Sequence, residues 1–195
     1  MINLFLQFEK ALTYTETHVK QLRKFSLFSV GRHYVNHLIE TCEFDSAAGL
    51  LPRVFRGEKR LWQEEILRFI RLNQVASIGP HVPLGRSKNQ IKLDSTVYEA
   101  VLMGFLKLEP RRDEVFLDLV REWPPELYDV SRIVDNVLNQ LLVMPDNQTL
   151  QRILATLFSQ QKKYDKAMAM YLKLGHKDVF QLIRYAFLKL ISTLF

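Results

Sequence analysis

KYDKAMAMYLKL, residues 163–174, contains the pattern that decides the fold: an aromatic residue, an acid, any residue and an alanine, followed by an apolar helical run. The same order occurs at Phe8-Glu9-Lys10-Ala11 and at Phe44-Asp45-Ser46-Ala47. The second copy begins 36 residues after the first, and the third begins 120 residues after the second, which is three steps of 40. Recurrence every 35 to 45 residues or so is typical of paired-helix solenoids, whose units bury their apolar faces against one another.

Each position of this pattern has a physical reason. The aromatic ring fills the groove between two helices, and the acid suits the first turn of a helix, where the macrodipole is positive. The small alanine lets a partner helix approach closely. We predict that the aromatic residues and alanines of the three copies pack between the helices of the repeat, together with Tyr171 from the third run. The predicted packing residues are Phe8, Ala11, Phe44, Ala47, Tyr164, Ala167 and Tyr171.

The rest of the chain reads as helices joined by short breaks. Apolar residues recur at three and four along most segments, and no segment alternates with period two over the length of a strand. The predicted helices cover residues 4–24, 30–42, 47–55, 58–73, 97–106, 115–123, 133–142, 150–158, 164–174 and 179–195. The sequence therefore predicts an all-α antiparallel array of about five helical hairpins, an α-solenoid occupying residues 1–195 as a single segment.

Helix ends give more local predictions. Pro52 should kink or shorten its helix, and Gly57 can end that helix in the left-handed conformation. Pro110 can sit in the first turn of a later helix. Asp129 or Ser131, and Asn147 or Thr149, can cap the two helices that follow. Residues 79–92, rich in Pro, Gly and polar side chains, form the one long irregular loop that we expect.

Composition limits the environment but not the partner. The chain has 195 residues, 48% of them apolar, and a net charge of +6, which suits acidic proteins, anionic lipids and nucleic acids equally. Cys42 is the only cysteine, so neither an internal disulfide nor a cysteine-based zinc site is possible. No apolar run approaches the roughly 20 residues of a membrane span. These features predict a cytoplasmic chain.

Catalytic and metal-binding patterns are weak. His33, His37 and Glu40 lie on one helix, but Tyr34 occupies the place of the glutamate in an HExxH motif, so packing is the favoured interpretation. The run GPHVPLGRS has the wrong glycine spacing for a phosphate-binding loop. We find no catalytic constellation, and predict neither an enzyme nor a cofactor.

Basic residues suggest where a partner could bind. Arg53, Arg56 and Arg60 are close in sequence, and Arg86 and Lys88 lie in the 79–92 loop. We predict these five as a partner surface. An alternative function is a helical-repeat RNA-binding protein, which a pI of 9.4 permits. Against that alternative, the three copies of the repeat differ at polar positions, so no recurring two-residue code is present, and nucleic acid is an unlikely partner.

Four longer runs carry a family resemblance. They are GRHYVNHLIE (31–40), YEAVLMGFL (98–106), LVREWPPELYDVS (119–131) and HKDVFQLI (176–183). In these runs the sequence resembles the family of light vacuolar-protein-sorting subunits of the HOPS tethering complex, which is built on clathrin heavy-chain repeats. The resemblance is collinear from Phe8 to Arg184, after which the apolar residues 185–195 diverge.

The resemblance implies a clathrin heavy-chain-repeat, TPR-like solenoid from the middle of a larger protein. The family's N-terminal β-propeller and C-terminal RING-type module are expected to be absent from this chain, which would make it a fragment. It also implies a non-enzymatic scaffold in vesicle-mediated protein transport, acting when late endosomes dock and fuse with lysosomes or the vacuole. Its implied partners are other HOPS subunits, a Rab-type small GTPase and an adaptor complex, at the cytoplasmic face of late endosome, lysosome or vacuole membranes.

Overall fold

The computed structural model describes residues 2–18, 27–86 and 90–175, and every regular element in those ranges is a helix. The only β-type pairing among them is an isolated antiparallel bridge between Leu84 and Lys92. The chain divides into two compact units, Met1–Leu93 and Asp94–Phe195. The prediction of an all-α fold is confirmed.

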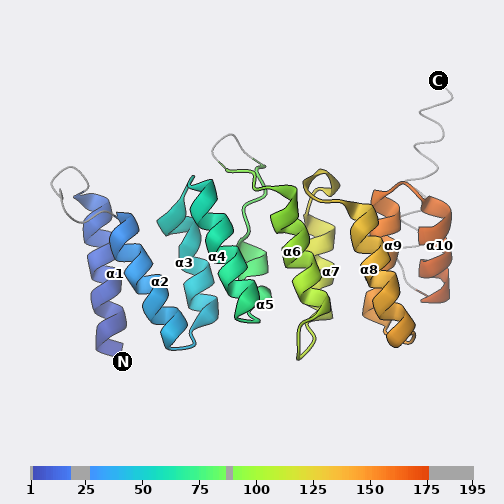
Figure 1. Cartoon of the computed structure of the whole chain (residues 1–195), viewed down its shortest axis with the longest axis horizontal. Coiled ribbons are helices and arrows are strands. Elements are labelled where there is room, and N and C mark those ends of the chain that lie inside the picture. Colours follow the sequence, from blue (N-terminus) through green and yellow to red (C-terminus); the bar gives the residue numbers. More distant parts are fainter. Residues whose placement is uncertain (1, 19–26, 87–89, 176–195) are drawn as a thin grey trace, which may run out of the picture. The chain divides into compact units, whose positions relative to one another are not determined.

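The described residues of the first unit form five α-helices and one 3₁₀ helix, with α1 to α4 standing side by side (Figure 1). Helix α2 packs most closely on α3, α1 packs on α2, and α5 lies against both α3 and α4. The elements are α1 (Ile2–Thr17), α2 (Leu27–Glu40), α3 (Phe44–Phe55), α4 (Lys59–Arg71), α5 (Val75–Ile78) and η1 (Gly79–His81).

The second unit repeats this arrangement of neighbouring antiparallel helices (Figure 1). Helix α9 is at its centre, because α7, α8 and α10 all pack on it, while α6 contacts α7 and α8. The elements are α6 (Ser95–Leu106), α7 (Asp113–Glu122), η2 (Pro125–Leu127), α8 (Val130–Val143), α9 (Gln148–Gln160) and α10 (Tyr164–Lys173).

Aromatic pairs fill the core of each unit. In the first unit, Phe55 meets Trp62 edge-on, with ring centroids 6.1 Å apart. In the second, Tyr98 meets Trp123 edge-on at 5.4 Å, and Phe105 stacks on Phe116 at 5.7 Å. These separations fall in the range in which aromatic pairs add stability beyond their buried area.

Three of the connections between helices have the same turn geometry. Cys42, Asn73 and Lys162 all adopt left-handed backbone, with φ of 62°, 59° and 62°. In each turn the next residue's N–H donates to the carbonyl five residues before it: Glu43 to Leu38, Gln74 to Phe69, and Lys163 to Phe158, at 2.7 to 2.9 Å. This is the Schellman arrangement, which satisfies carbonyls left open at a helix end.

The turn explains the repeat found in the sequence. The aromatic residues Phe44 and Tyr164 both stand two positions after the left-handed residue, where the next helix begins. The turn at Asn73 has the same geometry, but Val75 stands in the aromatic position. The sequence pattern therefore missed this copy, and with it the short helix α5.

Several predicted helix ends are wrong by a turn or less. Helix α3 continues through Pro52 to Phe55, since a proline near the helix end removes one donor without stopping the last residues. Arg56, not Gly57, has the positive φ, 41°, and its ψ of −113° lies outside the left-handed helical conformation. Helix α7 begins at Asp113 rather than at Pro110, because Asp113 and Glu114 supply the acids of its first turn.

The predicted caps of α8 and α9 are confirmed. The Asp129 carboxylate accepts hydrogen bonds from the N–H groups of Ser131 and Arg132, and the Asn147 side chain accepts one from Leu150. At the N-terminus, α1 ends at Thr17 and α2 begins at Leu27, where helices at 4–24 and 30–42 were predicted. The predicted helix at 179–195 lies outside the described residues.

Candidate docking surfaces

Most of the predicted repeat-packing side chains lie between helices. Ala47 and Ala167 have no exposed surface. Phe8 stacks on Tyr34 of α2 with ring centroids 4.9 Å apart, and Phe44 meets Phe69 of α4 edge-on at 6.5 Å.

The α10 copy of the pattern also faces its neighbour α9. Tyr171 is buried beside Ala155, and its hydroxyl lies 3.1 Å from that of Thr156. Tyr164, at the first position of α10, is half-buried.

Ala11 does not play the part expected of it. Its side chain is exposed, whereas the adjacent Leu12 is fully buried. The corresponding alanines, Ala47 and Ala167, are fully buried, and their helices α3 and α10 pack on the helices that come before them in the chain, α2 and α9. Among the described helices, α2 packs most closely on α1, and this packing leaves Ala11 exposed.

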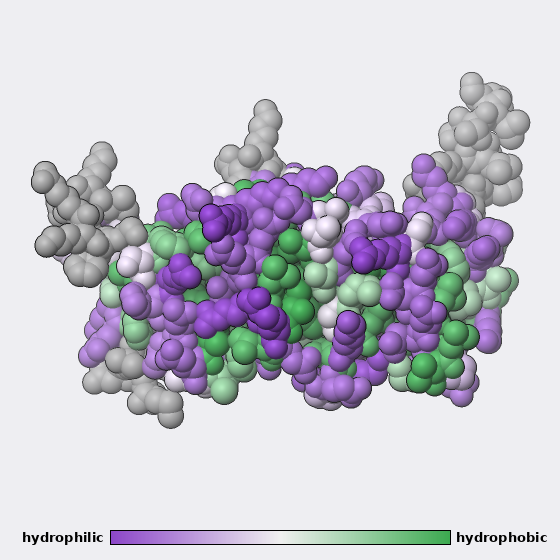
Figure 2. Space-filling view, in the orientation of Figure 1, coloured by the Kyte–Doolittle hydropathy of each residue, from purple (hydrophilic) through white to green (hydrophobic). Residues whose placement is uncertain are grey.

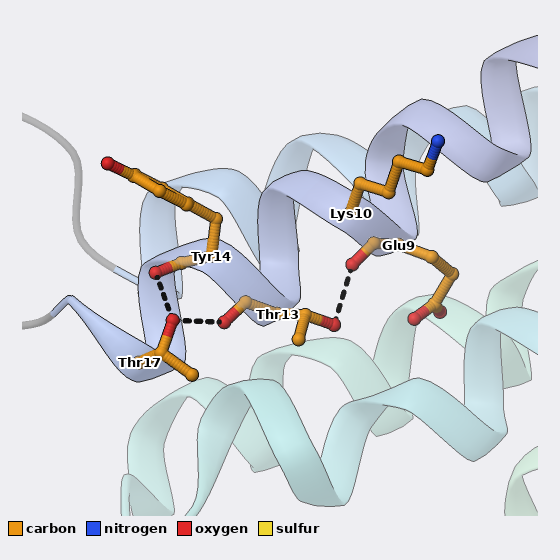
Figure 3. A pocket seen from close by; sticks show the side chains of 5 residues that line it. All are labelled: Glu9, Lys10, Thr13, Tyr14 and Thr17. Carbon is orange, nitrogen blue, oxygen red and sulfur yellow. Dashed lines mark hydrogen bonds between the residues drawn. The ribbon is translucent and has the colours of Figure 1, made fainter.

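The outer face of α1 carries a shallow hollow of about 390 Å³ (Figure 3). Thr13 and Thr17 donate their hydroxyl protons to backbone carbonyls of α1 itself, at 2.9 and 3.1 Å. Tyr14 and Lys10 point away from the neighbouring helices, and Tyr14 is 54% exposed. With its threonine hydroxyls bonded within α1, this face offers threonine methyl groups and an aromatic ring beside the charged side chains of Glu9 and Lys10.

Arg53, the first residue of the predicted basic surface, is used inside the fold. Its guanidinium lies 3.1 Å from the carboxylate of Glu9 and 2.8 Å from that of Glu16, and so ties α3 to α1. The hydrogen bond from Arg53 lowers the pKa of Glu16 below its ordinary value. Arg53 therefore contributes little free positive charge to a partner.

The other predicted cations are more open. Arg56 is exposed, and its carbonyl accepts a hydrogen bond from the Trp62 indole at 3.3 Å. Arg60 is exposed but pairs with Glu64 at 2.9 Å along α4. Arg86 is exposed, and its backbone N–H donates to Gln90. Lys88 lies outside the described residues, so the five-residue basic surface stays a prediction.

An apolar surface that the sequence analysis missed lies at the ends of α8 and α10. Leu142 and Val143 are 82% and 76% exposed, and Leu172 is 63% exposed. Both helices end at the lower side of their unit, where hydrophobic side chains gather (Figures 1 and 2). In the sequence these residues looked like part of the core, because they continue the apolar runs of α8 and α10.

No metal centre is formed within residues 2–18, 27–86 and 90–175: they contain no group of three His, Cys, Asp or Glu side chains placed to hold an ion. The ring of His37 instead stacks on Phe8, with centroids 5.4 Å apart. The helices in these ranges include none that is both long and apolar enough to span a bilayer.

Comparison with known proteins identifies the family of this helical repeat. The family model described as the Vps41 TPR-like region matches residues 29–191. The chain belongs to this family. The match to the Vps41 TPR-like family ends seven residues beyond Arg184.

Relatives from distant organisms agree with the family assignment. The chain is 36% identical over 177 residues to the vacuolar protein sorting-associated protein 41 homologs of Danio rerio and Homo sapiens. It is 30% identical over 185 residues to the homolog of Solanum lycopersicum. These alignments use 91 to 93% of the chain but only 18 to 20% of each relative, so the chain spans about a fifth of their length. No solved structure matches it.

Proposed function

We propose that the chain is a non-enzymatic scaffold segment of a HOPS-type tethering subunit. In this role it serves vesicle-mediated protein transport and the docking and fusion of late endosomes with lysosomes or the vacuole. Its partners are other HOPS subunits, with a Rab-type small GTPase and an adaptor complex engaged through longer proteins of the family. It acts in the cytoplasm, peripherally on those membranes.

The observation that carries this proposal is the family match over residues 29–191, on a chain whose described part is helical repeat throughout. The relatives are named for vacuolar protein sorting. Packed helices joined by hydrogen-bonded turns hold side chains from many repeats in fixed relative positions within a unit. Several weak contacts on such a surface reinforce one another when partners assemble. Neither the family nor the relatives' names favour the RNA-binding alternative.

Affinity purification of the tagged chain from its own cells tests the proposal. Half of each sample is treated with ribonuclease, and co-purifying proteins are identified by mass spectrometry. A Leu51→Asp variant serves as the control, because Leu51 is fully buried and an unpaired charge there should unfold the first unit. Proteins that co-purify with both the wild-type chain and the unfolded variant do not depend on the fold and are counted as nonspecific background.

We expect HOPS subunits to co-purify with the wild-type chain, resistant to ribonuclease and absent from the control. Partners lost on ribonuclease treatment, with no tethering subunit among them, would overturn the proposal and support RNA binding. Recovery of chaperones alone from both chains would contradict the claim that this segment is sufficient for assembly.

A further inference from the structure

A polar groove of about 480 Å³ runs between α2 and α4 in the first unit. Arg32 and Asn36 line it from α2, and Glu65, Arg68 and Arg71 line it from α4. None of these residues belongs to the basic surface predicted from the sequence. Figure 2 shows that hydrophilic side chains are dense over α4.

The two carboxylates that line the groove are already paired. Glu65 is buried and accepts a hydrogen bond from Arg68 at 3.0 Å, and Arg68 also donates to Asn36 across the groove at 2.7 Å. Glu64 pairs with Arg60 outside the groove at 2.9 Å. Arg68 is therefore held rigidly by one partner on each wall.

The two remaining arginines are available. Arg32 and Arg71 are both exposed, and neither has a carboxylate partner in the described part of the chain. The guanidinium of Arg32 lies 5.8 Å from the centre of the Phe28 ring, a contact that leaves its N–H donors open. Leu61, which is half-buried, adds apolar surface to the same groove, whereas Phe55 lines it as a core residue that is only 2% exposed. The site thus offers forked cationic donors beside an apolar contact.

We propose that this groove binds an acidic segment of a partner protein, with its carboxylates on Arg32 and Arg71 and an adjacent apolar side chain on Leu61. Guanidinium groups match carboxylates in two-point hydrogen bonds, which are stronger than neutral ones. This inference does not depend on the tethering role.

The charges of the chain favour a protein ligand of this kind. Residues 1–93 contain 14 Lys and Arg against 8 Asp and Glu, whereas residues 94–195 contain 13 of each. The whole net charge of +6 therefore comes from the part of the sequence that contains the groove. Although Glu64 pairs with Arg60, its exposed carboxylate would repel the closely spaced phosphates of a nucleic acid or an anionic bilayer, whereas a peptide can place single carboxylates away from it.

Fluorescence anisotropy on the whole 195-residue chain tests the proposal. The probe is a short labelled peptide in which Glu and Leu alternate, and its matched control replaces every Glu with Gln. The Arg32→Gln/Arg71→Gln variant removes the two open guanidinium groups. Lys10→Gln/Lys92→Gln removes the same charge from exposed sites in the same unit outside the groove. Circular dichroism checks that all three proteins are equally helical.

We expect the acidic peptide to bind and the Gln peptide to bind at least about tenfold more weakly. Added salt should lower the affinity for the acidic peptide. The arginine variant should lose about tenfold in affinity, and the lysine variant less than about threefold. No binding of the acidic peptide, or equal losses in the two variants, would overturn the proposal. So would tighter binding of phosphatidylserine-containing vesicles or poly-uridine that depends on Arg32 and Arg71, because the groove would then serve a membrane or nucleic acid.

Discussion

Replacing Gly31 with alanine probes how closely α2 packs on α3. Gly31 is buried inside α2, and a Cβ at that position would lie 2.5 Å from Cγ2 and 2.6 Å from Cγ1 of Val54. Ordinary carbon–carbon contacts are about 3.5 to 4.0 Å, so one side would have to move by about 1 Å. Val54 is buried and has a stiff, branched side chain, so it cannot rotate away at low cost.

Two opposing terms set the size of the effect. Alanine in place of glycine inside a helix gains about 1 kcal/mol, and forcing an extra carbon into a packed core costs about 1 to 3 kcal/mol. The clash at Gly31 is severe, so we expect a net loss of about 1 to 2 kcal/mol. Gly49 in α3 is the matched control, since its Cβ would meet nothing nearer than His81 at 3.8 Å. Gly49→Ala should gain up to about 1 kcal/mol.

Urea denaturation followed by circular dichroism measures both variants, with the difference in unfolding free energy expected to be about 2 to 3 kcal/mol. A Gly31→Ala/Val54→Ala double variant removes the two methyl groups in the clash. It should be more stable than Val54→Ala alone, because the new Cβ then fills space that the valine left. Equal stability of the Gly31 and Gly49 variants, or no rescue in the double variant, would refute the packing argument.

Three further predictions concern the turns and the second unit. Lys162→Gly should raise the unfolding free energy by about 0.5 to 1 kcal/mol, because φ is 62° there, whereas Lys162→Ala should give no gain in the same urea titration. Glu99→Ala should lower the unfolding free energy by about 2 to 3 kcal/mol in urea denaturation. The buried Glu99 carboxylate accepts hydrogen bonds from the Asp129 N–H at 3.2 Å and the Arg132 guanidinium at 2.8 Å. An unchanged urea midpoint would contradict that role. Burial raises the pKa of Tyr128 to about 12, so the folded state keeps its proton above pH 10 while the unfolded chain loses it. Stability should therefore fall as pH rises from about 10 toward 12, by up to about 3 kcal/mol, and urea midpoints in Tyr128→Phe should fall less steeply.

The helical fold could be predicted from the sequence because its signals are local. Apolar spacing predicted the helices, and Asp129 and Asn147 sit at their caps as expected. The turn at Asn73 could not be recognised in the same way, because its geometry depends on backbone hydrogen bonds and Val75 does not resemble an aromatic residue. Ala11 shows the opposite error, a residue that fits the pattern and is nevertheless exposed. Whether such an alanine is buried depends on a neighbouring helix, which the pattern does not encode.

Docking surfaces were harder to predict, because sequence proximity is a poor guide to free charge. Arg53 stands in the densest basic stretch, yet two carboxylates from α1, 37 and 44 residues earlier in the chain, neutralise it. Arg32 and Arg71 are far apart in sequence and looked like ordinary outer-face residues, yet the packing of the first unit places them on one groove. What separates the two cases is whether the fold supplies a carboxylate to each guanidinium. A search for partner surfaces in helical repeats should therefore begin from cations that remain unpaired after the helices are packed, and not from clusters in the sequence.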